Sequence, residues 1–504
     1  MFADRILILS VFVVASCGLA YELIVGALSS YLLGDSILQY SSIIGCYLFA
    51  MGVGSHVSKY VRDEDTVSRF VEIELLVGLI GGVSASVLFL VFAWLASPFR
   101  TVLYALVFLI GMLVGMEIPL VMRIFNERRA EFREMVSRVL TFDYLGALAV
   151  SLLFPLLLAP KLGLARTALL FGIANVLVAL LTARHFREHI RSPRGVKLRG
   201  MAVLVLLLAA FVGAGRMTKL AEQGLFGDNI VHAVTTPYQR LVITQWKDDL
   251  RLYLNGNLQF SSLDEHRYHE ALIHPAMQNL PAAHSVLVLG GGDGLAVREL
   301  LKYKQLEQIT LVDLDAQMTT LFSSAARLTA LNQHALTDTR VKVINADAAQ
   351  WLENSYAQFD LIVIDLPDPS SYALGKLYSV PMYRLVSKHL AANGYIVVQS
   401  TSPWYAPHAF WCVVETLKAA GLHTWPYHAH VPSFGEWGYV LAAPHERFVI
   451  PTSYSIPMRF LDADTTRAMF SFPTDMQVPQ VEANHLNDQV LVRYFEQDWG
   501  RMQH

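Results

Sequence analysis

The chain has 504 residues, enough for two or three domains, and 54% of them are hydrophobic whereas only 16% are charged. With a mean hydropathy of +0.40, this composition is too apolar for an ordinary soluble protein. The formal net charge of −3 excludes the basic balance typical of a nucleic-acid-binding protein. The cysteines Cys17, Cys46 and Cys412 are too scattered for a disulfide framework or a metal site, so we expect no bound metal.

The apolar residues are concentrated before residue 215, in seven runs. These runs cover residues 6–33, 37–57, 71–95, 101–122, 139–158, 164–181 and 201–214. Most approach the ~20 residues that a helix needs to cross a bilayer, and the last is the shortest. The first run is too long for a signal peptide and has no obvious cleavage site. The sequence therefore predicts a multi-pass α-helical membrane domain of about seven helices over residues 1–215.

Basic residues are distributed unevenly among the loops between these runs. The loops after the second, fourth and sixth runs hold nearly all of them: Lys59, Arg62, Arg69, Arg123, Arg128, Arg129, Arg133, Arg138 and the basic residues within 184–199. The positive-inside rule then places these loops and the N-terminus in the cytoplasm. Seven crossings would put the remainder of the chain outside, whereas a short seventh run that only dips into the membrane would keep it inside.

Among the acidic residues within apolar runs, we single out Glu22, Glu117 and Asp143. Ionisable groups at membrane depth are costly, at ~3 kcal/mol or more, and commonly mark a functional site in the bundle interior. A position near a helix end, with the carboxylate at the interface or paired with a basic loop, explains them equally well. Both hypotheses stay open at this point.

Residues 216–263 are predicted to form a polar connector, up to residue 229, followed by a small antiparallel β unit. Three short strand-like runs cover residues 238–246, 250–254 and 258–260. Asn255-Gly256-Asn257 joins the last two and is a strong hairpin signal. Residues 264–278 then show helical spacing, with Asp264 as a suitable N-cap.

The segment SVLVLGGGDG at 285–294 predicts a strand, a tight glycine turn and a helix start, typical of a nucleotide-binding sheet. Asp313 follows Asp293 by twenty residues at the end of the next strand, where such folds keep a ribose-binding acid. Strands at 309–312, 341–344, 361–364 and 395–398 alternate with helical stretches. We therefore expect an α/β Rossmann-like domain over residues 264–450, mostly parallel with helices on both faces, and a C-terminal extension over 451–504 with an amphipathic helix at 483–499.

Polar residues follow the carboxyl ends of the predicted strands, where ligands bind in such sheets. They are Asp293, Asp313, Asp347, Asp365, Asp368 and Gln399. A site with this many acids suits a cationic ligand rather than a phosphate. Other interpretations are that Asp313 and Asp347 cap helices and that Asp368 forms a turn before Pro369.

Several of these motifs together resemble one known family. They are YHEALIHP, VLVLGGGDG, LVDLD, the Asp347-Ala348 pair, VIDLPDP and LYSVPMYRLV with GYIVVQS, all within residues 238–443. The combination resembles the spermidine synthases, or polyamine aminopropyltransferases. The glycine turn alone is shared with methyltransferases, whereas YHE and Asp-x-x-Asp-Pro are much more specific. The apolar half resembles the membrane-spanning extension of a bacterial branch of that family.

The resemblance implies a fold of the S-adenosylmethionine-binding type and an aminopropyl transfer. Decarboxylated S-adenosylmethionine would be a co-substrate, with no permanently bound cofactor, and a diamine such as putrescine would accept the group to give spermidine and methylthioadenosine. The leaving group is a neutral thioether, so no general acid is needed. The amine must lose a proton, so a carboxylate base is needed.

The resemblance also implies roles for single residues. Asp365 would be the base, helped by Tyr268, and Asp368 would hold another ammonium group. The remaining assignments are Gln239 and Asp313 for the nucleoside, with Asp313 on the ribose, Asp347 and Ala348 for the adenine, Asp293 and His269 along the aminopropyl and polyamine channel, and Gln399 for the amine. His269 could instead be a structural histidine. Phe434 stands where the family has a tyrosine, so the identity of the acceptor stays open.

Two other functions remain as alternatives. One is an S-adenosylmethionine-dependent methyltransferase, and the other is a membrane polyamine transporter or sensor with a binding domain that does not catalyse. The expected partners are a polyamine substrate and the lipid bilayer, with no nucleic acid, and the β unit resembles the part through which soluble members form homo-oligomers. Because decarboxylated S-adenosylmethionine should be a cytosolic metabolite, we expect an inner-membrane protein whose catalytic domain is cytoplasmic.

Overall fold

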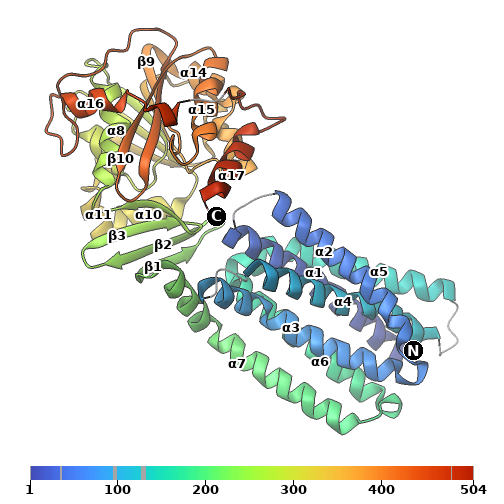
Figure 1. Cartoon of the computed structure of the whole chain (residues 1–504). Helices are drawn as coiled ribbons and strands as arrows, with labels where there is room; N and C mark the ends of the chain where they lie inside the picture. Colours follow the sequence, from blue (N-terminus) through green and yellow to red (C-terminus); the bar gives the residue numbers. More distant parts are fainter. Residues whose placement is uncertain (1, 34–36, 95–98, 127–131, 478–479, 503–504) are drawn as a thin grey trace. The chain divides into compact units, whose positions relative to one another are not determined.

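The computed structural model describes residues 2–33, 37–94, 99–126, 132–477 and 480–502 (Figure 1). The chain divides into two compact units, the first ending at Asn229 and the second starting at Ile230. The first unit is helical, and the second holds both the small β unit and the predicted α/β domain. The division therefore falls later than the predicted end of the helical part at residue 215.

The described part of the first unit contains seven α-helices that pack side by side (Figure 1). They are α1 (Phe2–Leu33), α2 (Ile37–Val57), α3 (Thr66–Trp94), α4 (Phe99–Asn126), α5 (Phe132–Leu153), α6 (Ala159–His185) and α7 (Pro193–Phe226). By length and composition alone, five segments of described residues could cross a membrane, and one of them, Val136–His185, contains both α5 and α6. Helix α2 contacts α4 so closely that a Cβ on Gly54 would lie 1.9 Å from the carbonyl oxygen of Met112.

Helix α7 differs from the sequence-based expectation. It is 34 residues long, so the short apolar run at 201–214 is only its middle part and most of the predicted polar connector is helical. The stretch after residue 214 contains helix formers and no proline, so nothing in the sequence ends the helix earlier. Gly227, at φ 68°, ends it as a left-handed C-cap.

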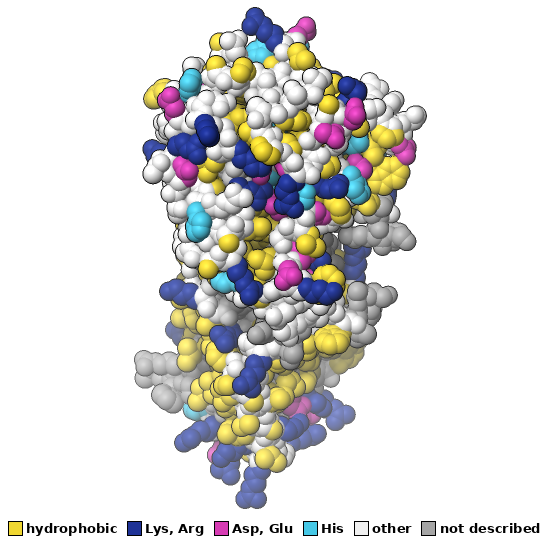
Figure 2. All heavy atoms as spheres, turned by 90° about the vertical axis from the view of Figure 1, so that its left-hand side faces the viewer, with side chains coloured by type: hydrophobic (Ala, Val, Ile, Leu, Met, Phe, Trp, Pro, Cys, Tyr) yellow, Lys and Arg dark blue, Asp and Glu magenta, His cyan; other side chains and the backbone are white. Residues whose placement is uncertain are grey.

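Ion pairs join the basic loops of the first unit. Arg123, at the end of α4, donates to the carbonyl oxygens of Ser58 and Val61 and pairs with Asp63, all between α2 and α3. Arg191, between α6 and α7, lies 3.1 Å from a carboxylate oxygen of Asp65. The loops rich in Lys and Arg thus meet at one end of the bundle, where Figure 2 shows basic side chains below a band of hydrophobic ones.

The second unit begins with a four-stranded sheet of order β1-β2-β3-β4, in which β2, β3 and β4 are antiparallel neighbours. Its strands are β1 (Asn229–Thr235), β2 (Arg240–Trp246), β3 (Asp249–Leu254) and β4 (Asn257–Ser261). The predicted hairpin joins β3 to β4, with positive φ angles at Asn255 and Gly256. Strand β1 was not predicted because its side chains are mostly exposed and show no clear alternation of apolar and polar residues.

A seven-stranded sheet of order β10-β11-β9-β8-β5-β6-β7 follows. Its strands are β5 (Ser285–Gly290), β6 (Gln308–Asp313), β7 (Val341–Asn345), β8 (Phe359–Asp365), β9 (Leu390–Gln399), β10 (His423–Val431) and β11 (Gly435–Ala443). The five strands expected from the sequence are present and parallel, which confirms the Rossmann-type α/β prediction. Strands β11 and β10 add an antiparallel edge. Pro426 in β10 concealed this edge in the sequence, and an edge strand tolerates proline.

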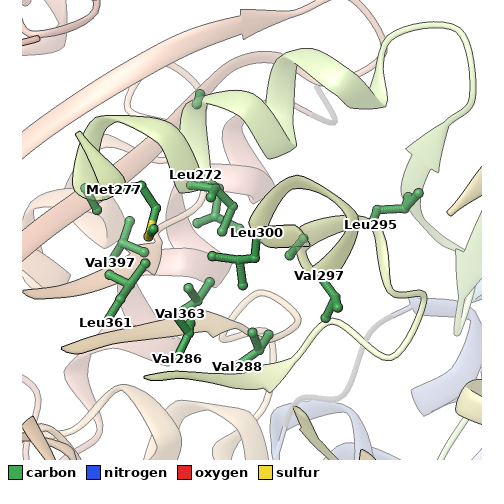
Figure 3. Close-up of a cluster of buried hydrophobic side chains, with 14 of the residues drawn as sticks. Leu272, Met277, Val286, Val288, Leu295, Val297, Leu300, Leu361, Val363 and Val397 are labelled. Atoms are coloured by element: carbon green, nitrogen blue, oxygen red, sulfur yellow. The ribbon is translucent and has the colours of Figure 1, made fainter. Parts of the chain in front are cut away.

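Helices cover both faces of this sheet. Among them are α8 (Glu265–Met277), α9 (Leu295–Leu301), α10 (Ala316–Ser324), α12 (Ala348–Glu353), α14 (Val380–Lys388), α15 (Pro407–Ala419) and α17 (Val490–Met502). On one face, Leu272 of α8 and Leu300 of α9 pack with Val286 and Val363 (Figure 3). The alternate strand residues, such as Leu287, pack with α12, α14, α15 and α17. Strand residues therefore alternate between two apolar cores, and the carboxyl ends of the parallel strands stay free for a site.

Candidate active site

The glycine turn starts at Gly290, the last residue of β5, and continues through Gly291, Gly292, Asp293 and Gly294 to α9. It lies directly against the ends of two neighbouring strands. Gly290 has φ 83°, and a Cβ on it would lie 2.1 Å from the carbonyl oxygen of Asp365. A Cβ on Gly292 would lie 2.6 Å from a carboxylate oxygen of Asp313. Glycine is required here both for the left-handed backbone and for the close approach.

We expect Gly290→Ala to destabilise the full chain by ~2–4 kcal/mol, because the new methyl group adds a steric clash to the cost of the positive φ. Gly256→Ala is the matched control, since Gly256 has φ 84° but no atom within 4 Å of the place that a Cβ would take. It should cost only ~1 kcal/mol. Thermal unfolding of both variants in detergent measures the difference, and equal losses would contradict the steric argument.

The predicted catalytic pair comes together at the end of β8. The hydroxyl group of Tyr268, on α8, donates a hydrogen bond of 2.6 Å to Oδ1 of Asp365. Both side chains are half-buried. Burial raises the pKa of Asp365, although the positive field of His269 and the bond from Tyr268 oppose this rise. The carboxylate is thus a stronger base than an exposed aspartate and is held in a fixed orientation.

Asp368 lies beside a network of neutral donors after β8 and β9. It accepts hydrogen bonds from Nε2 of Gln399 at 3.4 Å and from the hydroxyl of Thr401 at 3.3 Å. Burial raises the pKa of Asp368 to about 7, against the lowering effect of these two bonds. Asp368 therefore takes part in more than a turn before proline, and Gln399 lies next to it.

Further members of this network were missed in the sequence. Nε2 of Gln399 also donates to the hydroxyl oxygen of Tyr378 at 2.9 Å, and Nε1 of Trp437 donates to Oε1 of Gln399 at 3.2 Å. Phe434 packs beside them, and the centroids of the Phe434 and Trp437 rings are 5.1 Å apart. Tyr378 lies in the LYSVPMYRLV motif of the resemblance, but neither it nor Trp437 carries a local chemical signal. The distinguishing feature of Thr401 is its positive φ of 57°, which is unusual for a residue other than glycine, and the sequence does not reveal this angle.

At the end of β6, Asp313 binds the glycine turn rather than capping a helix. Its carboxylate accepts backbone N–H groups from Asp315 at 2.8 Å and from Gly292 at 3.1 Å. Burial raises the pKa of Asp313 to about 6 despite these bonds. The helix cap of α10 is instead Asp315, the second acid of LVDLD, which also accepts Nε2 of Gln239 at 3.0 Å. The structure thus brings Gln239 to the same strand end as Asp313.

Asp347 behaves as the capping interpretation predicts. Its Oδ1 accepts the backbone N–H of Gln350 at 3.0 Å, at the start of α12, and its side chain stays half-buried. Ala348 is buried in the first turn of that helix. This pair follows β7, which is next to β6, so Asp347 lies one strand away from Asp313.

His269 belongs to α8, and Asp293 belongs to the glycine turn. Oδ1 of Asp293 accepts the backbone N–H of Leu295 at 2.9 Å, and burial raises the pKa of Asp293 to about 6. Nδ1 of His269 lies 2.9 Å from Oε2 of Glu265. Burial lowers the pKa of His269, but this contact and the field of Asp293 outweigh it and raise the value.

Glu265 was missed as a support of His269. Arg298, on α9, binds both carboxylate oxygens of Glu265, at 2.8 and 2.9 Å, and all three side chains are buried. Burial would raise the pKa of Glu265, but the bonds from His269 and Arg298 lower it to about 2. The spacing of four residues between Glu265 and His269 on one helix face was the available sequence signal.

The donors just described to Asp293, Asp313, Asp365 and Asp368 are all neutral: two hydroxyl groups, one amide side chain and three backbone N–H groups. These bonds orient the carboxylates without cancelling their charge. Each of the four has a raised pKa because burial disfavours its ionised form. A cationic ligand would relieve that penalty, so the geometry fits an amine or a sulfonium.

Comparisons with known proteins agree with this chemistry. Residues 265–452 match the family described as spermine/spermidine synthase domain. The chain is 63% identical over 501 residues to "Polyamine aminopropyltransferase 2" of Ralstonia nicotianae, covering 98% of each protein. It is 46% identical over 498 residues to "Polyamine aminopropyltransferase" of Leptospira interrogans, covering 98% of this chain and 99% of the relative. The crystal structure of spermidine synthase from Thermotoga maritima aligns with a TM-score of 0.43 at 21% identity, over 54% of this chain and 88% of that one.

Proposed function

This chain belongs to the polyamine aminopropyltransferase family, and from that premise we propose that it transfers the aminopropyl group of decarboxylated S-adenosylmethionine to a diamine such as putrescine. The products would be spermidine and methylthioadenosine. The observation that carries this proposal is the Tyr268–Asp365 bond at the centre of an acidic site. Its hydrogen-bond donors are neutral, so the site keeps its attraction for cations.

The chemistry follows from the charges. The amine nitrogen attacks the carbon beside the sulfonium, a C–N bond forms, and the C–S bond breaks so that its electron pair neutralises the sulfur. The leaving group is a neutral thioether and takes no proton. The proton leaves the amine instead, and Asp365 is the acceptor, since its pKa is raised and Tyr268 fixes its orientation.

The amine would lie along the two acids at the end of β8, next to Gln399 at the end of β9. Asp368 would bind the second ammonium group of the diamine, with Gln399 and Thr401 holding the carboxylate in place. Asp293 would line the path of the aminopropyl chain together with His269. A diamine then spans Asp365 and Asp368, and its reacting end is the one next to the base.

The nucleoside would lie over the glycine turn. Asp313 would accept the ribose hydroxyl groups, Gln239 would contact the nucleoside from the β unit, and Asp347 with Ala348 would border the adenine. Support comes from the position of Asp313, whose carboxylate is tied to the turn and to the end of β6. A nucleoside bound there has its sulfonium directed toward the acidic centre.

Family membership favours this function over the two alternatives. The relatives that cover nearly the whole chain are aminopropyltransferases by name, whereas a methyltransferase would share only the glycine turn. A polyamine transporter or sensor with an inert binding domain would not require a desolvated base in contact with a tyrosine. The chain is therefore an enzyme rather than a binding protein.

The test uses the full chain in detergent, supplied with decarboxylated S-adenosylmethionine and each of putrescine, cadaverine and spermidine. We expect methylthioadenosine to form only when an amine is present, and fastest with the true acceptor. Release of methylthioadenosine at the same rate without any amine would contradict amine transfer. Methyl transfer from S-adenosylmethionine itself would favour the methyltransferase.

We further propose that the first unit spans the inner membrane with its basic loops in the cytoplasm. Support comes from the apolar helices and from the ion pairs that gather those loops at one end. A cytoplasmic catalytic unit requires an even number of crossings, and seven crossings place it on the other side. In intact cells, a membrane-impermeant maleimide should label Tyr356→Cys, whose site is 99% exposed, only if the catalytic unit lies outside.

A further inference from the structure

Two carboxyl groups meet inside the helical unit, far along the chain from the catalytic residues. Glu74 lies on α3 and Glu117 on α4, and they are 0% and 2% exposed. Their side chains are within hydrogen-bonding reach of each other. Among the described residues, no donor satisfies either oxygen of Glu74 or Oε1 of Glu117. Glu74 was not singled out in the sequence, whereas Glu22 and Asp143, which were, are only half-buried.

Other buried oxygen atoms surround this pair. The phenol of Tyr21, on α1, is fully buried, interacts electrostatically with both carboxyl groups, and has no hydrogen-bond partner within the described ranges. Asn175, on α6, is also fully buried, and neither polar atom of its amide is bonded in that part of the chain. Its Cβ lies 3.2 Å from the position of a Cβ on Gly78, one turn along α3 from Glu74.

The neighbouring titratable groups, Cys17 and Tyr47, have hydrogen-bond partners of their own, so they do not belong to the set of unsatisfied polar groups. The thiol of Cys17 donates to the carbonyl oxygen of Phe171 at 3.4 Å, and the hydroxyl of Tyr47 donates to that of Gly18 at 2.9 Å. The unsatisfied groups are thus two carboxyls, one phenol and one amide, and each of them can offer an oxygen.

Two touching carboxylates in an apolar interior cannot both stay ionised without a positive charge between them. Oxygen ligands prefer hard cations. No group of three or more His, Cys, Asp or Glu residues suited to a metal ion occurs among the residues that the structure describes, so the pair lacks the additional charged ligand that a divalent cation commonly has. When one of the two carboxyl groups keeps its proton, a single positive charge balances the other, which suits a monovalent cation. We propose that Glu74, Glu117, Tyr21 and Asn175 form a binding site for an alkali-metal cation such as Na⁺, distinct from the catalytic site.

The first test is stabilisation of the full chain in detergent by NaCl, compared with N-methyl-D-glucamine chloride at equal ionic strength. A cation that binds only the folded state should raise the Tm in a saturable way. Glu74→Gln and Glu117→Gln should abolish this rise, and the half-buried control Glu22→Gln should keep it. Aminopropyl transfer should persist in all three variants, which shows that each has folded.

The second test needs no variant. Dicyclohexylcarbodiimide modifies protonated carboxyl groups in apolar surroundings, so NaCl should lower labelling of the peptides that contain Glu74 and Glu117 several-fold. Labelling and Tm that are both insensitive to NaCl would mean that the pair shares a permanent proton, and the proposal would be wrong. Stabilisation by putrescine dihydrochloride but not by NaCl would overturn it in favour of an organic ammonium site.

Discussion

Asp365→Asn should lower kcat of the aminopropyl transfer by ~10²–10⁴-fold, the range by which a positioned general base accelerates a reaction. The amide side chain has the same shape, but it cannot take the proton of the attacking amine at neutral pH. The bond from Tyr268 can still form to the amide oxygen, so the fold of the site should persist. Methylthioadenosine release under saturating substrates measures the loss.

Two further variants sharpen this prediction. Tyr268→Phe removes the donor but leaves the base, so its effect on kcat should be smaller than that of Asp365→Asn. Glu353→Gln removes an exposed carboxylate on α12 and should leave kcat unchanged. If Asp365→Asn retained more than a tenth of wild-type kcat, Asp365 could not be the base, and the assignment of proton transfer would have to move to another group.

Asp368→Asn should act on the amine rather than on the chemical step. Losing one charge-assisted hydrogen bond costs ~1.5–3 kcal/mol, so KM for the diamine should rise by roughly 10–100-fold, with a smaller change in kcat. KM for decarboxylated S-adenosylmethionine should stay near the wild-type value, because Asp313 and the glycine turn lie on the other side of the site. Steady-state kinetics with each substrate varied in turn separate the two effects.

The raised pKa of Asp368 adds a pH dependence with a definite sign. At pH 8 the carboxylate, whose pKa is about 7, is mostly ionised and attracts an ammonium group. As the pH falls through 7, Asp368 takes up a proton, so KM for the diamine should rise in the wild type. Asparagine does not titrate, so Asp368→Asn should lack this part of the profile. Parallel profiles in the two proteins would exclude Asp368 as the group that titrates.

The catalytic sheet could be predicted well because its parallel strands contain short, continuous apolar runs, each followed by an acid, by glycines or, in β9, by Gln399. Parallel strands end at the same edge, so Asp313, Asp365 and Asp368 could be brought together without a structure. The edge formed by β10 and β11 could not be predicted, because Pro426 and the histidines of β10 interrupt the apolar pattern of a strand. Helix α7 was underestimated for a different reason, because its polar end no longer resembles a membrane span although it continues as a helix.

The missed side chains share a physical cause. Glu265 and Arg298 pair with each other across a long stretch of sequence, and Glu74 is distinguished by its burial. Neither a contact between distant residues nor burial can be read from the pattern of residues along the chain. Arg298 on α9 is 33 residues from Glu265, and only the packing of α8 on α9 brings the pair together. Glu74 stands in an apolar run no more conspicuously than Glu22, and only its complete burial distinguishes the two.

The glycine turn has a consequence for the equilibrium binding of the two substrates. Its backbone contacts Asp365, on the proposed amine side, and Asp313, on the proposed nucleoside side. A displacement of the turn by one substrate therefore moves a carboxylate that serves the other. Such a link makes the two affinities interdependent, and thermodynamics requires the dependence to be mutual: the factor by which bound nucleoside changes amine affinity equals the factor by which bound amine changes nucleoside affinity.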